Sequence, residues 1–212
     1  MTEMIRLSIL AILLVLALFA LIGTTTVYAQ EQPGSDRFAA LGFGMCEDRP
    51  CFLGIAPRLT GWTDALKIGR GQGGLAAQAG NAADIVFDRN RQHVTVARSL
   101  NSRRVYYVNV SLGALTYNLS AGEMAERYGM PCKVLFDSAD SIAVLVYPYM
   151  AVTVTAPDSQ MSPQSAVKEI DLSDPSLDAM PMYDLCVVYH DYANWAGFAS
   201  AQYYTVNRLR AS

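Results

Sequence analysis

The chain of 212 residues carries 16 Lys and Arg against 19 Asp and Glu, which gives a formal net charge of −3. This mildly acidic balance excludes the basic surface that nucleic-acid binding requires, so no nucleic acid is expected as a partner. The length is sufficient for one well-filled domain or for two small halves.

The first 29 residues are predicted to be an export segment outside the fold. Arg6 precedes a mostly apolar run, Leu7–Ile22, and Val27 and Ala29 then meet the small-residue rule for signal-peptidase cleavage. A cleaved signal peptide is one interpretation. The alternative is an uncleaved membrane anchor, a hydrophobic helix over residues 5–28. Both predict an exported protein, extracellular or in the cell envelope, that meets the membrane only through this helix.

The remaining chain is predicted to hold a short leader and a folded part. Residues 30–45 are interpreted as an extended or disordered leader, since Gln30–Leu41 is polar and small. Residues 46–212 are expected to form a single α+β domain, or two halves of similar build over 46–115 and 116–212. Roughly 180 residues suit either description, so both stay open.

The first half is predicted to begin with a loop and a short helix. Prolines punctuate Cys46–Trp62, which indicates a loop that delivers apolar side chains to a core. Thr60 is expected to cap a helix over Gly61–Ile68, and Gly69 to end it. Apolar or alternating runs then predict a three-stranded meander: Asp84–Asp88, His93–Arg98 and Arg103–Val110.

A second helix has the clearest local pattern in the chain. Ser120 and Glu123 fit a capping box, and Leu119 and Met124 stand where a hydrophobic staple closes. Gly129 supplies a left-handed residue that ends the helix. Three more strands are predicted after it: Cys132–Asp137, Ile142–Pro148 and Ala151–Ala156.

The last part of the chain is predicted to be irregular. Pro157–Pro181 is rich in Ser, Asp and Pro, which is typical of a long loop, with Ala166–Ile170 as a strand inside it. Beyond this stretch, Tyr183–His190 and Ala201–Val206 bracket an aromatic loop. Four acidic residues lack the spacing of a calcium loop and are interpreted as solvated loop positions: Asp171, Asp174, Asp178 and Asp184.

The order of elements, a helix and then a meander, twice over, predicts an α+β fold with an antiparallel sheet and two short helices. Aligning the two helices sixty residues apart matches Thr60 with Ser120 and Gly69 with Gly129. Caps and terminal glycines recur in many helices. A tandem repeat is therefore one hypothesis, and two unrelated helices the other.

The chain contains four cysteines, and export changes what an even number of them indicates. Outside the cytosol they favour disulfides over a metal site. Cys46 and Cys51 are close enough for a local bridge, which leaves Cys132 and Cys186 as the second pair. The two other connectivities remain open. Zinc would need Cys-x-x-Cys spacing or nearby His, so no metal is predicted.

Two motifs in the chain are candidates for catalysis or cofactor binding. His190 and Asp191 could form half of a catalytic triad, but no serine lies in a nucleophile elbow. A hydrolase that uses this pair is kept as the alternative to a non-enzymatic protein. Residues 69–74, GRGQGG, match a dinucleotide-binding pattern but follow a helix instead of a strand, so no cofactor is predicted.

Aromatic residues near the C-terminus are the predicted binding residues. Trp195, Phe198, Tyr203 and Tyr204 cluster around a loop, where rigid amphipathic side chains would suit contact with a protein or a glycan. The alternative is that they pack the last part of the sheet, because strands favour aromatic residues.

Three stretches carry a resemblance to known families. LSAGEMAERYGMPCKV resembles the signature of the small outer-membrane-assembly lipoproteins, the SmpA/OmlA or BamE-like family. PCFLGIAPRLTGWTDAL and NWAGF are similar to patterns in uncharacterised bacterial envelope proteins. The tandem outline is similar to that of the β-lactamase inhibitor proteins. This resemblance implies a fold, an exported location and protein binding. The chain lacks a lipidated cysteine, so a role in membrane assembly is not carried over.

The sequence therefore predicts an exported, non-enzymatic protein that binds another envelope or extracellular protein. The contact is expected through the exposed sheet or through the aromatic loop at the C-terminus. Two alternatives stay open: a hydrolase-like enzyme, and a structural envelope component held by an uncleaved N-terminal helix.

Overall fold

The structure is a computed structural model that describes residues 37–79, 82–89, 91–99, 103–113, 119–137, 139–173, 185–188 and 192–204. The chain divides into two compact units, residues 1–41 and 42–212. In the first unit, only the helix α2 (Arg37–Leu41) is described. The predicted signal peptide or anchor therefore lies outside the described residues.

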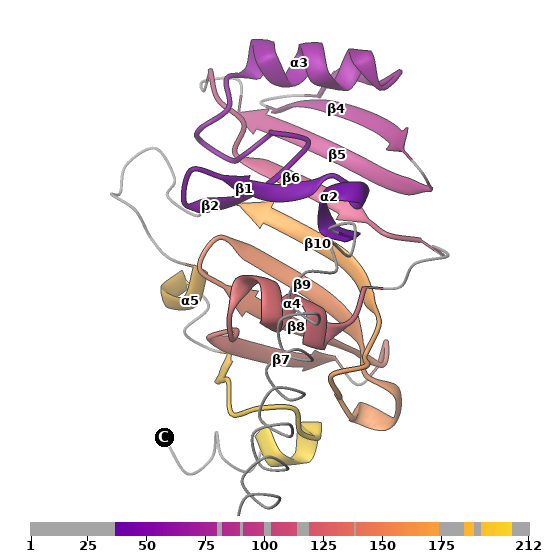
Figure 1. Ribbon diagram of the computed structural model, residues 1–212, viewed down its shortest axis with the longest axis vertical. Helices are drawn as coiled ribbons and strands as arrows, with labels where there is room; N and C mark the ends of the chain where they lie inside the picture. Colours follow the sequence, from indigo (N-terminus) through magenta and orange to yellow (C-terminus); the bar gives the residue numbers. More distant parts are fainter. Residues whose placement is uncertain are drawn as a thin grey trace, which may run out of the picture. The chain divides into compact units, whose positions relative to one another are not determined.

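The second unit contains a nine-stranded sheet in which all pairings are antiparallel. Its strands are β3 (Leu75–Ala79), β4 (Ala82–Arg89), β5 (Gln92–Ser99), β6 (Tyr107–Ser111), β7 (Lys133–Asp137), β8 (Ile142–Tyr147), β9 (Met150–Thr155), β10 (Val167–Ser173) and β11 (Ala193–Asn194). They lie in the order β11-β7-β8-β9-β10-β6-β5-β4-β3 (Figure 1). The predicted α+β class with an antiparallel sheet is confirmed.

A hairpin precedes the sheet where an extended leader and a loop were predicted. Strands β1 (Phe43–Cys46) and β2 (Arg49–Phe52) pair antiparallel, and α2 occupies part of the predicted leader. Phe43 lies opposite Phe52, with ring centroids 5.0 Å apart and both side chains buried. Apolar contact across the strands stabilises this hairpin. Its prolines and the closely spaced cysteines had indicated a loop instead.

Helix α3 (Trp62–Gly71) is longer than predicted, and Thr60 does not cap it. Gly61 is the N-cap residue, and no side chain caps the helix there. The Thr60 hydroxyl instead accepts a hydrogen bond of 2.9 Å from the Ala56 amide. The helix continues through Gly69, where an added Cβ would lie 2.6 Å from Ile85 Cγ2. Gly69 thus allows close packing of α3 on β4 instead of ending the helix.

Helix α4 (Ala121–Tyr128) is built as predicted. The Ser120 hydroxyl accepts from the Glu123 amide at 3.2 Å, and the Glu123 carboxylate accepts from the Ser120 amide at 2.8 Å. Gly129 follows with a φ of 84°, in the left-handed region. Leu119 and Met124 are buried. These bonds join residues within one helical turn, so local sequence is enough to specify them.

Strands β3 and β10 differ from the prediction. The strand β3 lies in an Ala-rich segment that has low intrinsic β propensity. The stretch Pro157–Pro181 was predicted as a long loop, but it contains the 3₁₀ helix η1 (Pro157–Ser159) and the full strand β10. The latter lies at the centre of the sheet, between β9 and β6. Its place depends on neighbours distant in sequence.

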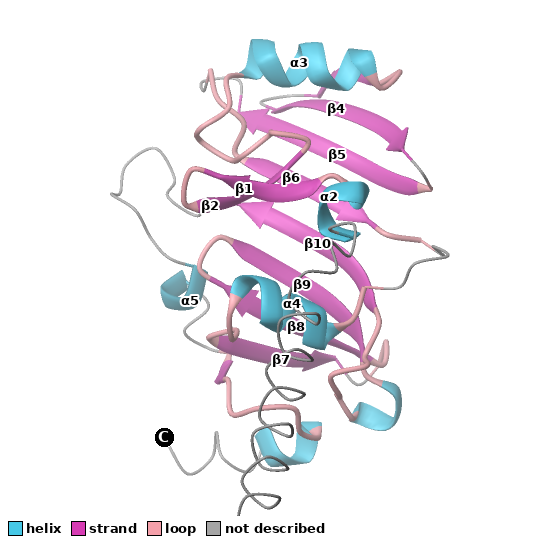
Figure 2. Ribbon diagram, in the orientation of Figure 1, coloured by secondary structure: helices cyan, strands magenta, loops and turns pink. Residues whose placement is uncertain are grey.

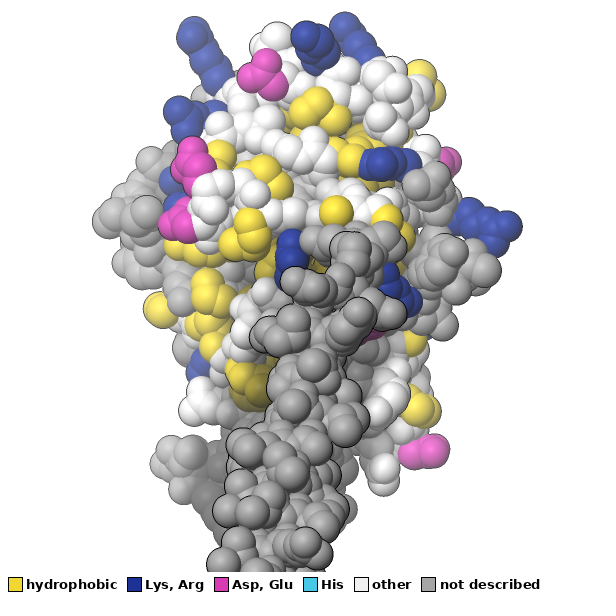
Figure 3. Space-filling model, in the orientation of Figure 1, with side chains coloured by type: hydrophobic (Ala, Val, Ile, Leu, Met, Phe, Trp, Pro, Cys, Tyr) yellow, Lys and Arg dark blue, Asp and Glu magenta, His cyan; other side chains and the backbone are white. Residues whose placement is uncertain are grey.

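One face of the sheet carries the core. A row of directly paired residues crosses seven strands with exposed fractions of 4% or less: Phe87, Val94, Val110, Ile170, Val152, Leu145 and Val134. Helix α4 and the β1–β2 hairpin lie in front of the sheet in the view of Figure 2. In the same orientation, Lys and Arg side chains are scattered over the visible part of the described surface, with hydrophobic groups between them (Figure 3).

The second unit contains two successive segments, each a helix followed by four antiparallel strands. In each segment, a backbone hydrogen bond joins the first residue of the helix to the residues just before the fourth strand, β6 or β10. Trp62 N donates to Arg103 O as Ala121 N donates to Ser165 O, each within 2.9 Å. This sets Trp62 against Ala121, which is one residue out of register with the predicted alignment of Thr60 with Ser120.

Candidate functional site

The sheet face opposite the core is partly exposed. Side chains alternate between the two faces of a strand, so the neighbours of the buried row point the other way. We use the name open face for nine partly exposed positions on the four strands β5, β6, β9 and β10: Thr95, Tyr107, Asn109, Ser111, Ala151, Thr153, Glu169, Asp171 and Ser173. Eight of these nine side chains can form hydrogen bonds, unlike the apolar row on the core face.

A polar cluster lies at the centre of the open face, on the paired strands β6 and β10. Tyr107 donates its hydroxyl to Asp171 Oδ1 at 2.5 Å, and Asn109 Nδ2 donates to the same oxygen at 2.7 Å. Asn109 Nδ2 also donates to the Glu169 carboxylate. Within the described ranges, no Lys or Arg forms an ion pair with either carboxylate. The cluster therefore presents two carboxylates held by neutral donors.

The environment of Tyr107 reflects this arrangement. Burial is the largest cause that raises the pKa of its phenol above the ordinary value, followed by the hydrogen bond to Asp171 and that residue's negative charge. The phenol thus remains protonated at neutral pH and acts as a hydrogen-bond donor to the carboxylate. This arrangement can hold the two carboxylates in place.

Alternation of apolar and polar residues is the sequence signal for the two strands of this cluster; the prediction used it for β6 but ended the second strand at Ile170. Residues 107–111 and 168–173 read YVNVS and KEIDLS, in which apolar residues alternate with polar ones. This period of two is typical of half-buried strands. Asp171 was predicted to be a solvated loop residue; that is wrong, because it lies in a central strand. Asp174, Asp178 and Asp184 lie outside the described residues.

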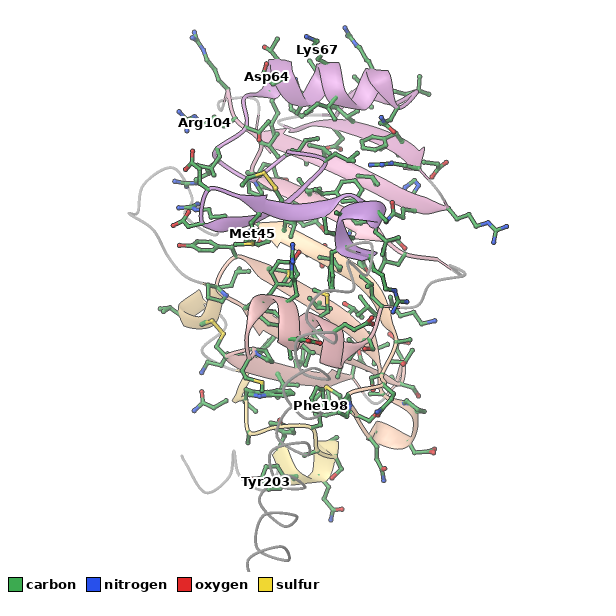
Figure 4. The ribbon with its side chains drawn as sticks, viewed as in Figure 1. Met45, Asp64, Lys67, Arg104, Phe198 and Tyr203 are labelled. Atoms are coloured by element: carbon green, nitrogen blue, oxygen red, sulfur yellow. A yellow bond between two sulfur atoms is a disulfide. The ribbon has the colours of Figure 1, made fainter. Side chains whose placement is uncertain are left out.

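The predicted aromatic binding residues fall into two pairs. Trp195 and Phe198 stand edge to face, with ring centroids 5.2 Å apart, as do Tyr203 and Tyr204 at 5.6 Å. Phe198 and Tyr203 lie toward the same end of the molecule (Figure 4). Residues 201–204 are helical, and the short helix α5 (Leu185–Val188) lies in the preceding segment.

Only part of this aromatic set is available for contact. Tyr204 is buried against Phe136, with ring centroids 5.5 Å apart. Its hydroxyl accepts from the Ala196 amide at 3.2 Å and donates to Gly197 O at 2.5 Å, which closes the loop. Burial also raises the pKa of this phenol. Tyr203 is 48% exposed. Tyr204 therefore holds the loop, and Tyr203 is the exposed member of the set.

Both expected disulfides are present. Cys46 bonds to Cys51 within the β1–β2 hairpin, and Cys132 bonds to Cys186 across 54 residues. The second bridge ties α5 to the residue that precedes β7. The pairing that local spacing favoured is confirmed, and the two other connectivities are excluded.

The remaining candidates for chemistry are only partly described. His190 and Asp191 lie outside the described residues. Residues 69–74, which match the dinucleotide pattern, form the end of α3 and the turn after it, so no strand precedes them. Among the described residues, no helix is long and apolar enough to cross a membrane.

Comparison with known proteins finds one weak structural similarity. No family model matches the chain, and no curated protein matches it. Among solved structures, a cysteine-rich secretory protein from Staphylococcus aureus subsp. aureus Mu50 is similar over 61% of this chain, with 10% identity and a TM-score of 0.32. The match spans about half, 52%, of that protein. At this TM-score, no argument about fold or function is drawn from the likeness.

Proposed function

We propose that the chain is an exported, non-enzymatic binding module that contacts a partner protein through the open face. The observation that carries this proposal is the polar cluster of Tyr107, Asn109, Glu169 and Asp171 at the centre of that face. Hydrogen bonds hold each of these side chains in one orientation, so little side-chain entropy is lost when a partner binds. Threonines beside the cluster add further groups for hydrogen bonding.

The charge of the cluster indicates the chemistry of the partner. Two carboxylates with neutral donors leave negative charge at a partly exposed position. A Lys or Arg side chain on the partner would complement this charge and determine the orientation of the complex. We therefore expect a protein with a basic residue at the centre of its contact surface, bordered by polar and small apolar groups.

Two further features support the wider proposal. The two disulfides are typical of proteins that leave the reducing cytosol, which supports export. The matched hydrogen bonds of the two helix-plus-meander segments support a tandem repeat. In that alignment Asn109 corresponds to Asp171 and Tyr107 to Glu169. The cluster then lies where the two repeats meet, on the equivalent strands β6 and β10, which carry different side chains at matching positions.

Site-specific photo-crosslinking in cells that export the protein tests the proposal. A benzophenone side chain replaces Thr153 on the open face in one variant and Glu126 on α4 in the control. We expect a partner adduct from position 153 and none from position 126. The adduct should also be lost when Glu169→Gln and Asp171→Asn are added, because these changes remove charge and retain shape. Equal adducts from both positions, or an adduct insensitive to the two changes, would contradict the proposal.

A further inference from the structure

The two edges of the nine-stranded sheet differ. At one edge β11 pairs with β7, and Lys133 donates a hydrogen bond of 2.7 Å to the Asn194 side chain. At the other edge β3 pairs with β4, and no strand in the described part of the chain pairs with its outer side. The outer main-chain N–H and C=O groups of β3 therefore form a template for another strand.

Strands β3 and β7 are the outermost strands of the two helix-plus-meander segments, although β7 has β11 on its outer side. Asn109 and Asp171 are paired where the two segments meet. Going from Asn109 to its partner on each next strand ends at Leu75 on β3. Going from Asp171 in the other direction ends at Lys133 on β7. Lys133 is charged and its strand has β11 beside it, whereas Leu75 is 79% exposed. Strand β7 thus carries a charge and is covered by β11, whereas β3 carries no charge and has no covering strand among the described residues.

Neither the composition nor the register of β3 opposes pairing with a copy of itself. Its residues, Leu-Ala-Ala-Gln-Ala, include no charge and no proline. Its register with β4 runs without a bulge from Leu75 opposite Val86 to Ala79 opposite Ala82. Charges, prolines and bulges are the features by which natural edge strands prevent pairing with another chain. A second copy would meet neither like-charge repulsion nor an irregular backbone.

We propose that β3 pairs antiparallel with β3 of a second copy of this chain, which gives a two-fold symmetric dimer with a continuous sheet. A register centred on Ala77 sets Leu75 of each copy opposite Ala79 of the other, so a large side chain meets a small one. The same antiparallel relation between equivalent strands joins β6 and β10 within the chain. A charged strand of another protein would find no complementary charge on β3.

The expected dimer is weak. A contact between two five-residue strands buries less than the roughly 1,200 Å² of a stable protein interface, so assembly should increase with concentration. Partner binding through the open face does not require this dimer. The crosslinking test at position 153 can therefore be carried out on the monomer as well.

Sedimentation velocity of the exported full chain, from about 1 µM to about 1 mM, tests the proposal. Ala77→Lys places two like charges at the two-fold axis, and Leu75→Lys adds charge at an exposed position that tolerates it. Thr63→Lys, on the exposed side of α3, is the matched control with the same added charge. We expect a concentration-dependent dimer in the wild type and the control. Its dissociation constant should rise at least about tenfold in both edge variants, which is about 1.4 kcal/mol.

Three outcomes would overturn the proposal. One is a wild-type protein that remains monomeric at the highest concentration. Another is a dimer equally weakened by Thr63→Lys, which indicates a general charge effect. The third is a dimer that neither edge substitution changes, which places the contact elsewhere. Circular dichroism melting of Leu75→Lys establishes that the variant is folded.

Discussion

Asn109 and Asp171 are direct partners across strands β6 and β10, and the Asn109 amide donates to the Asp171 carboxylate at 2.7 Å. The pair lies where the first four-stranded segment meets the second. On the opposite face, neighbouring positions of the same strands carry fully buried Val and Ile side chains. The seam of the sheet is thus apolar on the core face and held by hydrogen bonds on the open face.

Replacing Asn109 with Leu should destabilise the fold by about 1–3 kcal/mol. The substitution removes the donor shared by Glu169 and Asp171 and leaves two partly buried carboxylates without it. Urea unfolding at neutral pH measures the change. Thr95→Val, at the adjacent open-face position on β5, should cost less. An Asn109→Leu loss no larger than that of Thr95→Val would show that the cluster contributes nothing to stability.

The stability of the protein should fall at alkaline pH, and Tyr107 should contribute to the fall. An unfolded tyrosine releases its proton near its ordinary pKa of 10.0, whereas burial and Asp171 raise the pKa of Tyr107 in the folded state. Its contribution is therefore complete below about pH 10 and is lost as the pH rises above that value. Urea unfolding between about pH 8 and about pH 11 should show a shallower decline for Tyr107→Phe.

Asp171→Asn provides the internal test of this cause. It should lower the pKa of the Tyr107 phenol without returning it to the ordinary value, because burial is the larger cause. The phenol is followed by ultraviolet absorbance, as the difference from Tyr107→Phe. A titration midpoint that does not move in Asp171→Asn contradicts the assigned hydrogen bond.

Gly69→Ala should destabilise the protein by about 1–3 kcal/mol although alanine favours helix. The added Cβ would stand 2.6 Å from Ile85 Cγ2, so α3 or β4 must shift. Gly71→Ala, two residues along the same helix, meets nothing within 4 Å and should be neutral or slightly stabilising. Thermal melts of both variants give the comparison. Equal effects at the two sites would mean that the packing of α3 on β4 is not close.

Tyr204→Phe should cost about 1 kcal/mol or more, because the loop loses two hydrogen bonds at a buried hydroxyl. Tyr203→Phe should change stability by less than about 0.5 kcal/mol, since that side chain is 48% exposed. Urea unfolding of the two variants distinguishes the structural tyrosine from the exposed one. The reverse order would assign the loop contacts to Tyr203.

Features that depend on near neighbours in the chain could be predicted from the sequence alone. The capping box of Ser120 and Glu123 was predictable, because both hydrogen bonds lie within one helical turn. The short spacing of Cys46 and Cys51 favoured their bridge, which left the second pair. Most strands of the sheet followed from alternating or apolar runs, and with them the α+β class.

Features that depend on residues far apart in the chain could not be predicted without the folded structure. Gly69 was expected to end a helix, but its missing side chain serves the contact with Ile85. The polar residues around Asp171 led to the prediction of a loop. In the structure Asp171 lies in a strand, because β10 pairs with β6 on one side and with β9 on the other. The polar cluster arises from the same pairing. Local propensity carries no information about which distant strands will meet, because apolar burial on the core face determines their register.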